Sequence, residues 1–381
     1  MNNPKTIYLS LGSNLGNKLL NLQHAVFKIS ENIGNVQAVS RTYESAAWGF
    51  ESDDFLNICI SVITEITPNE LLQKVNSIEE ELGRLRNADG VYKARTLDID
   101  ILYYGNEVIE TESLTIPHPS LHLRQFVLRP LGDIAPQFYH PIFNKDTRNM
   151  VQMCKDKGGI KRTFSKVYKS REQLFSKLNF IAIEGNIGAG KTTLATQISE
   201  DFNAKLILEQ FADNPFLPKF YEDQARYAFP LEMSFLAERY QQFSDDTSQF
   251  DLFKSFLVSD YDIYKSLIFA KVTLQEDEFN LYRKVFSFMH KEVQKPGLYV
   301  YLYQNTERLL ENIKNRDRDY EQNIPPEYLE KINRGYLDFI KSAPDHNTLI
   351  VDISELDFVK NKSDYNHIID KIVEYSVNLE N

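Results

Sequence analysis

The chain of 381 residues predicts two folded domains: an α+β sandwich of ferredoxin-like type, then an α/β domain whose parallel sheet is covered by helices. The first half orders its predicted elements β-α-β-β-α-β, which is typical of the ferredoxin-like sandwich. The second half alternates strands with helices, which is typical of a parallel sheet. Between them, residues 161–177 are basic and are expected to form a linker, so we predict domains over residues 1–160 and 178–381.

Apolar spacing predicts the elements of the first half. Apolar residues recur at helical intervals after residue 17, and Pro68 with Glu70 marks the first turn of a second helix. The strands show alternation or runs of Ile and Val. The predicted elements are a strand over residues 6–11, a helix over 17–33, strands over 36–44 and 55–66, a helix over 68–82 and a strand over 97–104.

The second half places short apolar strands between helical segments. An apolar run begins at residue 180, and a long helix is predicted over residues 227–243. Further strands are predicted over residues 205–208, 256–258, 298–303 and 348–351. Ligands bind at the carboxyl ends of the strands in such sheets. The residues that follow each strand are therefore candidates for a ligand site.

Composition excludes several classes of protein. Residues 1–177 carry 21 Lys and Arg against 20 Asp and Glu, whereas residues 178–381 carry 22 against 34. An acidic second half would repel nucleic acid, so no nucleic-acid partner is expected. No signal peptide or membrane-spanning run is apparent, and no membrane partner is expected. Cys59 and Cys154 are typical of thiols in a reducing cytoplasm, so we expect a cytoplasmic protein.

A phosphate-binding loop follows the apolar run at residue 180. Residues 185–192 read Gly-x-x-x-x-Gly-Lys-Thr. Glycines let backbone N–H groups surround phosphate oxygens, and the next helix directs its positive end at them. Lys191 is expected to reach the outer phosphates, and the Thr192 hydroxyl to hold Mg²⁺. The sequence thus predicts a P-loop kinase that binds ATP through Gly185, Asn186, Gly188, Gly190, Lys191, Thr192 and Thr193.

Two carboxylates follow neighbouring strands of the second half. Glu209 ends the strand over residues 205–208, and Asp260 follows the strand over 256–258. Asp260 is a candidate Mg²⁺ ligand beside Thr192. Glu209 is a candidate base for an attacking hydroxyl, although an exposed strand end remains an alternative. Arg316 and Arg318 are expected to close over a transferring phosphate, or else to end a salt-bridged helix.

A second group of chemical residues lies in the first half. Asp98 and Asp100 are two apart on a predicted strand, so both face the same side. Such a pair can hold Mg²⁺, although a solvated strand face is an alternative. Arg84, Arg86 and Arg95 lie just upstream and could neutralise a polyphosphate. Together these residues favour a site for Mg²⁺ and a polyphosphate.

Residues 5–160 resemble 6-hydroxymethyl-7,8-dihydropterin pyrophosphokinase, the enzyme of folate biosynthesis. The resemblance rests on Leu-Gly-Ser-Asn-Leu-Gly at residues 11–16, on Arg-Thr-Leu-Asp-Ile-Asp at 95–100, on Ile-Pro-His-Pro at 116–119 and on Arg-Gln-Phe-Val-Leu-Arg-Pro-Leu at 124–131. It implies that a pyrophosphoryl group passes from ATP to the pterin hydroxymethyl group. Lys93-Ala94 and Trp48 depart from the usual family residues.

The resemblance also implies roles for residues of the first half. Asp98 and Asp100 are implied to bind Mg²⁺ between ATP and the attacking hydroxyl. The other implied roles are phosphate contact for Arg84 and Arg95, ATP binding for Glu79 and His118, pterin stacking for Phe55 and Phe126, and recognition of the pterin edge for Asn57. From the residues alone, Phe55 and Phe126 could equally be core residues, and His118 a turn residue.

Residues 178–378 resemble the deoxynucleoside kinases. The matching stretches are Glu-Gly-Asn-Ile-Gly-Ala-Gly-Lys-Thr-Thr at residues 184–193, Asn-Pro at 214–215, Phe-Tyr at 220–221, Phe-Leu at 235–236 together with Arg239, and Arg-Asp-Arg-Asp-Tyr-Glu-Gln at 316–322. The resemblance implies 5′-phosphorylation of a deoxynucleoside by ATP, in a homodimer. It implies that Glu209 is the base, that Tyr221 and Glu321 bind the sugar, and that Arg316 and Arg318 are lid arginines.

Three positions depart from the kinase pattern. Tyr261 stands where the family has an arginine near the 5′-oxygen, so Arg239, Lys265 or a lid arginine must supply that charge. Glu232 stands where a glutamine reads the base, and its carboxylate favours an N–H-rich edge such as that of guanine. We therefore expect a purine substrate. Ser266 stands where an acidic residue often partners Arg239.

These observations predict a bifunctional transferase that uses Mg²⁺ and ATP. The missing arginine at Tyr261 also allows a second hypothesis, in which the C-terminal half is a non-catalytic nucleotide-binding regulatory module. A third hypothesis, a nucleic-acid adaptor, rests on the basic junction and is disfavoured by the acidic second half.

Overall fold

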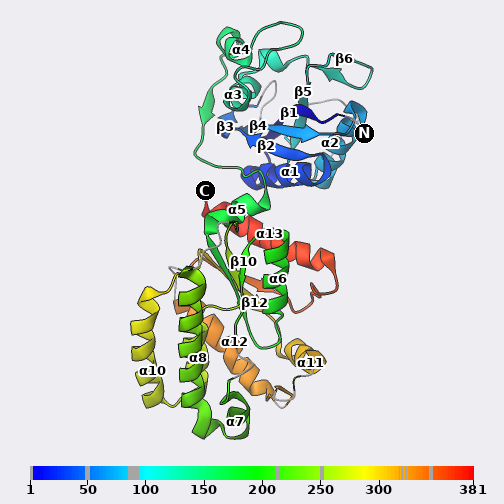
Figure 1. Ribbon diagram of the computed structural model, residues 1–381. Coiled ribbons are helices and arrows are strands. Elements are labelled where there is room, and N and C mark those ends of the chain that lie inside the picture. The colour runs from blue at the N-terminus through cyan, green and yellow to red at the C-terminus, as the bar shows by residue number, and fades with distance from the viewer. Residues whose placement is uncertain are drawn as a thin grey trace. The chain divides into compact units, whose positions relative to one another are not determined.

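The computed structural model describes residues 3–47, 52–84, 94–210, 214–248, 253–316, 318, 321–322, 324–342 and 346–381. Trp48, Arg86 and Lys93 lie outside these residues. The chain divides into two compact units (Figure 1). The N-terminal unit comprises Met1–Gln173 with Glu380–Asn381, and the C-terminal unit comprises Leu174–Leu379. The prediction of two domains is therefore confirmed.

The N-terminal unit begins with the predicted order of strands and helices, except that three strands, not two, lie between its first two helices. Its elements are β1 (Lys5–Ser13), α1 (Lys18–Asn32), β2 (Asn35–Val39), β3 (Tyr43–Ser45), β4 (Phe55–Thr64), α2 (Pro68–Glu81), β5 (Asp98–Tyr104), β6 (Ile109–Glu110), β7 (Thr115–Ile116), a 3₁₀ turn (Leu121–Leu123), α3 (Gln125–Ile134), α4 (Thr147–Met153) and β8 (Ile160–Arg162). The start of α2 follows from a capping box, in which the Thr67 hydroxyl accepts the Glu70 N–H and the Glu70 carboxylate accepts the Thr67 N–H.

An antiparallel sheet forms the centre of this unit. Its order is β5-β1-β4-β3-β8, and β2 also pairs with β4. The predicted strand over residues 36–44 is thus two strands, β2 and β3, which both pair with β4. The break falls at Ser40, whose hydroxyl accepts the N–H of Cys59 at 2.9 Å.

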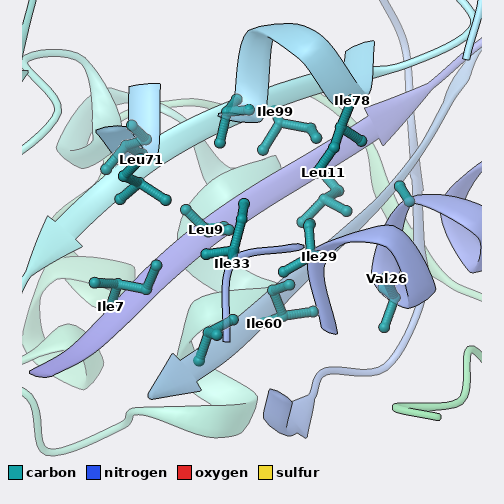
Figure 2. Packing of buried hydrophobic residues seen from close by; sticks show 14 of the residues in the cluster. Ile7, Leu9, Leu11, Val26, Ile29, Ile33, Ile60, Leu71, Ile78 and Ile99 are labelled. Atoms are coloured by element: carbon teal, nitrogen blue, oxygen red, sulfur yellow. The ribbon is translucent and has the colours of Figure 1, made fainter. Parts of the chain in front are cut away.

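Helices lie on both faces of this sheet (Figure 1). On one face, Ile7, Leu9 and Leu11 of β1 pack in a core with Ile29 of α1 and Leu71 of α2 (Figure 2). On the other face, α3 contributes to a second core that contains Val127, Leu128 and Leu131. The buried alternate positions of β1 fix the strand against its helices, and β4 and β5 pair with it on either side.

The expected linker over residues 161–177 is wrong. β8 pairs with β3, and the Thr163 N–H donates to the Thr42 carbonyl oxygen at 3.0 Å. The helix α5 (Arg171–Leu178) buries Leu174, Phe175 and Leu178, and the two units divide between Gln173 and Leu174. The lysines of this segment and Arg162 are exposed, whereas Arg171 is half-buried and pairs with Glu31. A basic composition is therefore compatible with a short edge strand and an amphipathic helix.

The C-terminal unit contains the predicted parallel sheet. Its elements after α5 are β9 (Phe180–Gly185), α6 (Lys191–Asp201), β10 (Lys205–Ile207), α7 (Leu217–Glu222), α8 (Gln224–Ser248), β11 (Leu257–Ser259), α9 (Lys265–Thr273), α10 (Glu276–Met289), a 3₁₀ turn (His290–Glu292), β12 (Leu298–Tyr303), α11 (Thr306–Arg316), α12 (Pro326–Ser342), β13 (Thr348–Asp352) and α13 (Lys362–Leu379). The sheet order is β10-β11-β9-β12-β13, with parallel neighbours throughout.

The order of these strands locates a ligand site. β9 lies between β11 and β12. The chain passes from β9 to β10 on one side of β9, and later crosses from β11 to β12 on the other side. Ligands bind at such a switch point, beyond the carboxyl ends of the strands. α6 contacts β9, β10 and β11, while Ile268 of α9 and Tyr336 of α12 pack in the core of the opposite face. The sheet is therefore covered on both faces, and its open end carries the phosphate-binding loop.

Candidate active sites

The carboxylates of Asp98 and Asp100 lie on the same face of β5, separated by buried Ile99. Asp98 Oδ1 lies 2.8 Å from a guanidinium nitrogen of Arg84 and 2.8 Å from one of Arg95. Asp100 has more distant neighbours, since His118 Nε2 lies at 3.8 Å and Arg124 NH1 at 3.9 Å. The protein thus compensates the charge of Asp98 closely and that of Asp100 only weakly.

Electrostatics reflect this asymmetry. Burial and the negative charge of Asp98 raise the pKa of Asp100 to about 7. Burial and the positive charge of Arg124 lower the pKa of His118 to about 4, so His118 is neutral at pH 7. The Ser120 N–H donates to His118 Nδ1 at 3.2 Å, which leaves the His118 proton on Nε2, facing Asp100.

Glu79 lies behind the carboxylate pair. Its Oε1 accepts the Ile99 N–H at 2.8 Å and also pairs with Arg84. Glu79 is almost fully buried and does not line the adjacent cavity. In this arrangement Glu79 holds β5 and Arg84 in position, and its predicted contact with ATP stays a prediction.

A cavity of about 530 Å³ opens beside the pair. Its lining residues are Ser10, Gly12, Ser45, Ala46, Phe55, Asn57, Arg95, Asp98, Asp100, Arg124 and Phe126. Phe55, Asn57 and Phe126, the predicted pterin-binding residues, are therefore brought together with the carboxylates. Asn57 Nδ2 donates to the Ser45 hydroxyl at 3.0 Å, which fixes the orientation of the amide. A Cβ at Gly12 would lie 3.2 Å from Asn57 Oδ1, so glycine makes room for the amide.

Arg124 was missed by the sequence analysis as a site residue. Its guanidinium carbon lies 5.7 Å from the centre of the Phe126 ring, and its NH1 faces Asp100. The signal was present in the motif at residues 124–131, because Arg124 is two residues before Phe126.

The phosphate-binding loop of the C-terminal unit runs from the end of β9 to the start of α6. Gly188 and Gly190 have φ of +84° and +81°, which favour glycine. A Cβ at Gly190 would lie 2.7 Å from the Phe358 ring, and one at Gly188 would lie 3.0 Å from the Leu309 carbonyl oxygen. Asn186 anchors the loop, because its Nδ2 donates to the Leu329 carbonyl at 2.8 Å.

Lys191, Thr192 and Asp260 meet at this loop. Lys191 Nζ donates to the Asn186 carbonyl oxygen at 2.9 Å. Burial and the charge of Lys265 lower the pKa of Lys191 to about 8. The Thr192 hydroxyl donates to Asp260 Oδ2 at 2.5 Å, and Asp260 Oδ1 accepts the Glu209 N–H at 2.7 Å. Asp260 therefore joins the start of α6 to Glu209, two residues beyond the end of β10. Thr193 follows on α6 and does not line the cavity described next.

Glu209 lies between two cations. Its Oε1 accepts two hydrogen bonds from Arg239, at 2.9 and 2.7 Å, and its Oε2 accepts one from Lys265 Nζ at 2.5 Å. Burial alone would raise the pKa of Glu209, but the charges of Lys265 and Arg239 outweigh burial and hold that pKa far below its usual range. The exposed alternative for Glu209 is wrong, since its side chain is only 8 % exposed. Glu209 is ionised and oriented.

A cavity of about 790 Å³ extends from the loop past Glu209. Its lining includes the predicted residues Lys191, Thr192, Glu209, Tyr221, Glu232, Arg239, Asp260, Arg316, Arg318 and Glu321, together with Lys265. Glu321 faces both lid arginines, with Arg318 NH1 at 3.2 Å and Arg316 NH1 at 3.9 Å. Both arginines thus face an acidic residue, as the alternative of a salt-bridged helix end expects, and both also line the cavity.

The departures from the kinase pattern have distinct locations. Tyr261 is fully buried in the core beneath the sheet and does not line the cavity. Lys265, one of the residues expected to replace the missing arginine, donates to Glu209 Oε2 at 2.5 Å. Ser266 replaces the acidic partner of Arg239, and its hydroxyl accepts Arg239 NH1 at 2.7 Å.

Comparisons with known proteins match the two halves of the chain to two different families. Residues 8–136 match the family model of 7,8-dihydro-6-hydroxymethylpterin-pyrophosphokinase, and residues 181–378 match that of deoxynucleoside kinase. Among the described residues, no helix combines the length and the apolar character that crossing a membrane requires.

Curated relatives cover each half of the chain. A 2-amino-4-hydroxy-6-hydroxymethyldihydropteridine pyrophosphokinase of Aquifex aeolicus is 42 % identical over 141 residues, 37 % of this chain and 86 % of the relative. A deoxyguanosine kinase of Bacillus subtilis is 40 % identical over 177 residues, 45 % of this chain and 86 % of the relative. A solved deoxyadenosine kinase of M. mycoides aligns with a TM-score of 0.45 and 27 % identity, over 51 % of this chain and 99 % of its own. The chain therefore belongs to both families, with a hydroxymethyldihydropterin pyrophosphokinase domain at its N-terminal end and a deoxynucleoside kinase domain at its C-terminal end.

Proposed function

We propose that the chain is a bifunctional transferase. Its N-terminal unit transfers a pyrophosphoryl group from ATP to 6-hydroxymethyl-7,8-dihydropterin and leaves AMP. Its C-terminal unit transfers a phosphoryl group from ATP to the 5′-hydroxyl of a deoxynucleoside. The observation that carries the proposal is that each unit has its own cavity, lined by carboxylates, cationic side chains and aromatic rings.

In the N-terminal unit, Asp98 and Asp100 fit a divalent cation. Both are carboxylates on one strand face, and Mg²⁺ is commonly held by one or two carboxylates together with substrate phosphates. When bound there, Mg²⁺ neutralises charge on the phosphates. Arg95 and Arg124 line the cavity and neutralise phosphate oxygens beside the pair. Phe55 and Phe126 enclose the pterin ring, and the amide of Asn57 binds its polar edge.

The proposed assignments for Arg84, Glu79 and His118 follow their positions. Arg84 is held by Glu79 and faces Asp98, so it orients the carboxylate and contacts phosphate. His118, neutral and with its proton on Nε2, donates toward Asp100 or a phosphate oxygen.

In the C-terminal unit, the carboxylate of Glu209 accepts a hydrogen bond from the 5′-hydroxyl of the nucleoside. The loop of Gly185, Asn186, Gly188 and Gly190 cradles ATP phosphates with backbone N–H groups, and Thr193 continues the helix behind them. Thr192 and Asp260 would hold Mg²⁺, and Lys191 neutralises phosphate charge. Arg316 and Arg318 close over the transferring group, while Tyr221 and Glu321 bind the sugar and Arg239 orients Glu209. Because a transfer of this kind depends on positioning and charge, an oriented carboxylate suffices even with a low pKa.

Several finer assignments belong to the same proposal. The order β5-β1-β4-β2, with α1 and α2 on one face, supports a ferredoxin-like N-terminal unit. A homodimer through the kinase unit and a cytoplasmic location follow from the family resemblance and from the free thiols of Cys59 and Cys154. The cation of Lys265 on Glu209 removes the reason for a non-catalytic C-terminal module. A purine substrate is supported by the acceptor Glu232 and by the deoxyguanosine kinase activity of a relative.

The test is a paired assay on the full chain. We expect Asp98→Ala to lower pterin-dependent AMP formation by about 10²- to 10³-fold and to leave transfer of labelled phosphate to deoxynucleosides unchanged. We expect Lys191→Ala to do the reverse. Loss of both activities in either variant, with the variant still folded, would contradict two independent sites.

A further inference from the structure

The phosphate-binding loop of the C-terminal unit is bonded to α11, the helix that ends at Arg316. Asn312 Nδ2 donates to the Gly188 carbonyl oxygen of the loop at 3.0 Å and to Gln304 Oε1 at 3.0 Å. The loop also approaches this helix closely, because a Cβ at Gly188 would lie 3.0 Å from the Ile313 side chain. A peptide unit is planar, so holding its carbonyl oxygen fixes the orientation of the whole unit in the loop.

The same loop is bonded to α12, the next helix of the chain. Asn186 Nδ2 donates to the Leu329 carbonyl oxygen at 2.8 Å and to Asn333 Oδ1 at 2.9 Å. Asn333 Nδ2 in turn donates to the Gln304 carbonyl oxygen at 3.0 Å, so Gln304 joins the contacts of both helices. Asn186, Asn333 and Gln304 are buried. The loop is therefore fixed to the two helices that flank Arg318 in the chain.

Asn312 and Arg316 are four residues apart on α11, so their side chains lie on the same face of the helix. Asn312 is half-buried and does not line the kinase cavity, whereas Arg316 lines it together with Ile187 and Lys191. Because Arg316 is the last residue of α11, its distance from the loop is set by where this helix is held.

We infer that Asn312 is a positioning residue of the kinase site. Its two hydrogen bonds hold the last turn of α11 at the phosphate loop, and so place the guanidinium of Arg316 at the phosphates that the loop binds. This inference rests on the proposed kinase function and adds a residue that touches no substrate. Small misplacements matter at such a site, because a shift of about 1 Å in a contributing group can lower a rate by about 10²-fold.

A purely structural role of Asn312 predicts a different result. If its hydrogen bonds only stabilised the loop, their removal would lower activity by the same factor whether or not Arg316 is present. If they act through Arg316, that loss disappears once Arg316 is replaced. A double-mutant cycle on the two residues distinguishes these cases.

The experiment measures kcat and KM of the full chain, of Asn312→Ala, of Arg316→Ala and of the double variant, with Mg²⁺, ATP and deoxyguanosine. We expect kcat to fall about 10- to 10²-fold in Asn312→Ala and about 10²- to 10³-fold in Arg316→Ala. We expect the double variant to lie within about threefold of Arg316→Ala, with little change in the nucleoside KM.

The matched control is Asn315→Ala, the same substitution at an exposed position of the same helix, which is expected to keep kcat within about twofold. Unchanged protection of the β9 amides from hydrogen exchange shows that each variant is folded. If Asn312→Ala loses this protection, Asn312→Leu takes its place in the cycle, since it keeps the volume of the side chain and removes both donated hydrogen bonds.

The outcomes separate this inference from the proposed function. Losses that multiply in the double variant, or an unchanged kcat in Asn312→Ala, would overturn the positioning role while the kinase function stands. Absence of turnover by the original chain with deoxyguanosine and with deoxyadenosine would overturn the kinase function.

In that case, calorimetric binding of Mg²⁺ with a non-hydrolysable ATP analogue to the same four chains decides the inference by itself. A loss of affinity in Asn312→Ala that vanishes in the Arg316→Ala background supports it. Equal losses in both backgrounds, or no loss in either, overturn it.

Discussion

In the N-terminal unit two carboxylates lie side by side on one strand, whereas in the C-terminal unit one carboxylate lies between two cations. Asp100 has only distant positive neighbours, and the charge of Asp98 disfavours its ionisation. Glu209 is bound by both Arg239 and Lys265, which hold it ionised. The two sites therefore obtain their compensating positive charge in different ways. The first is suited to receive a cation with its substrate, while the second carries its cations as side chains.

The largest expected effect comes from the same neutralising substitution in both units. Glu209→Gln removes the partner of two buried cations and is expected to destabilise the C-terminal unit by about 3 to 5 kcal/mol. Asp100→Asn removes a like-charge repulsion and is expected to leave the N-terminal unit as stable as before, or more stable. Hydrogen exchange of the amides of β9 and of β1 reports the two units separately. Equal losses of protection in the two variants would contradict the difference between the two carboxylates.

The second prediction concerns the cation that the C-terminal unit supplies. Lys265 begins α9, where a positive charge opposes the helix dipole, so its ion pair with Glu209 offsets an unfavourable position. We expect Lys265→Met to lower kcat for nucleoside phosphorylation by about 10²-fold with little change in the nucleoside KM. Lys265→Arg should keep kcat within about tenfold of the original value.

Steady-state kinetics of the full chain measure this effect. The pterin reaction of the same variants serves as the internal control, since its site is in the other unit. A rise in KM at unchanged kcat would show that Lys265 binds substrate and does not orient Glu209.

Local sequence patterns predicted those parts of the fold and site that neighbouring residues determine. The loop over residues 185–192, the pair on β5 and the strand ends at Glu209 and Asp260 are set by short spacing and by the parallel sheet. The partners of Glu209 were only named as alternatives, because Arg239 and Lys265 approach it from helices 30 and 56 residues away. The role of β8 was missed, because its pairing with β3 depends on a strand far away in the sequence.

The contacts expected for the pterin and the nucleoside also depend on residues that are distant in the sequence. Gly12 makes room for Asn57 because β1 and β4 pair in the register that places these two residues opposite each other. No local pattern contains that register. Likewise, the buried Oε2 of Glu232 makes no hydrogen bond within the described residues, which is visible only once the donors of Arg239 are assigned to other acceptors.

The smallest expected effect concerns a third kind of carboxylate, Glu184 at the end of β9, which is buried without a bonded cation among the described residues. Its oxygens accept the Asp262 N–H at 2.6 Å and the Tyr336 hydroxyl at 2.8 Å. Burial raises the pKa of Glu184 to about 7, above its usual value of 4.5. Folding therefore favours the protonated form, and this contribution to stability is present below about pH 4.5 and is lost as pH rises through about 7.

Glu184→Gln cannot titrate and escapes this loss. The stability of the variant relative to the original chain should therefore increase by about 1 to 3 kcal/mol between pH 5 and 8. Hydrogen exchange of β9 and β12, corrected for the intrinsic rate at each pH, measures that difference, and Glu330→Gln at an exposed position of α12 is the matched control. A constant difference across this range would mean that Glu184 is ionised throughout, which would place a compensating cation beside it, as beside Glu209.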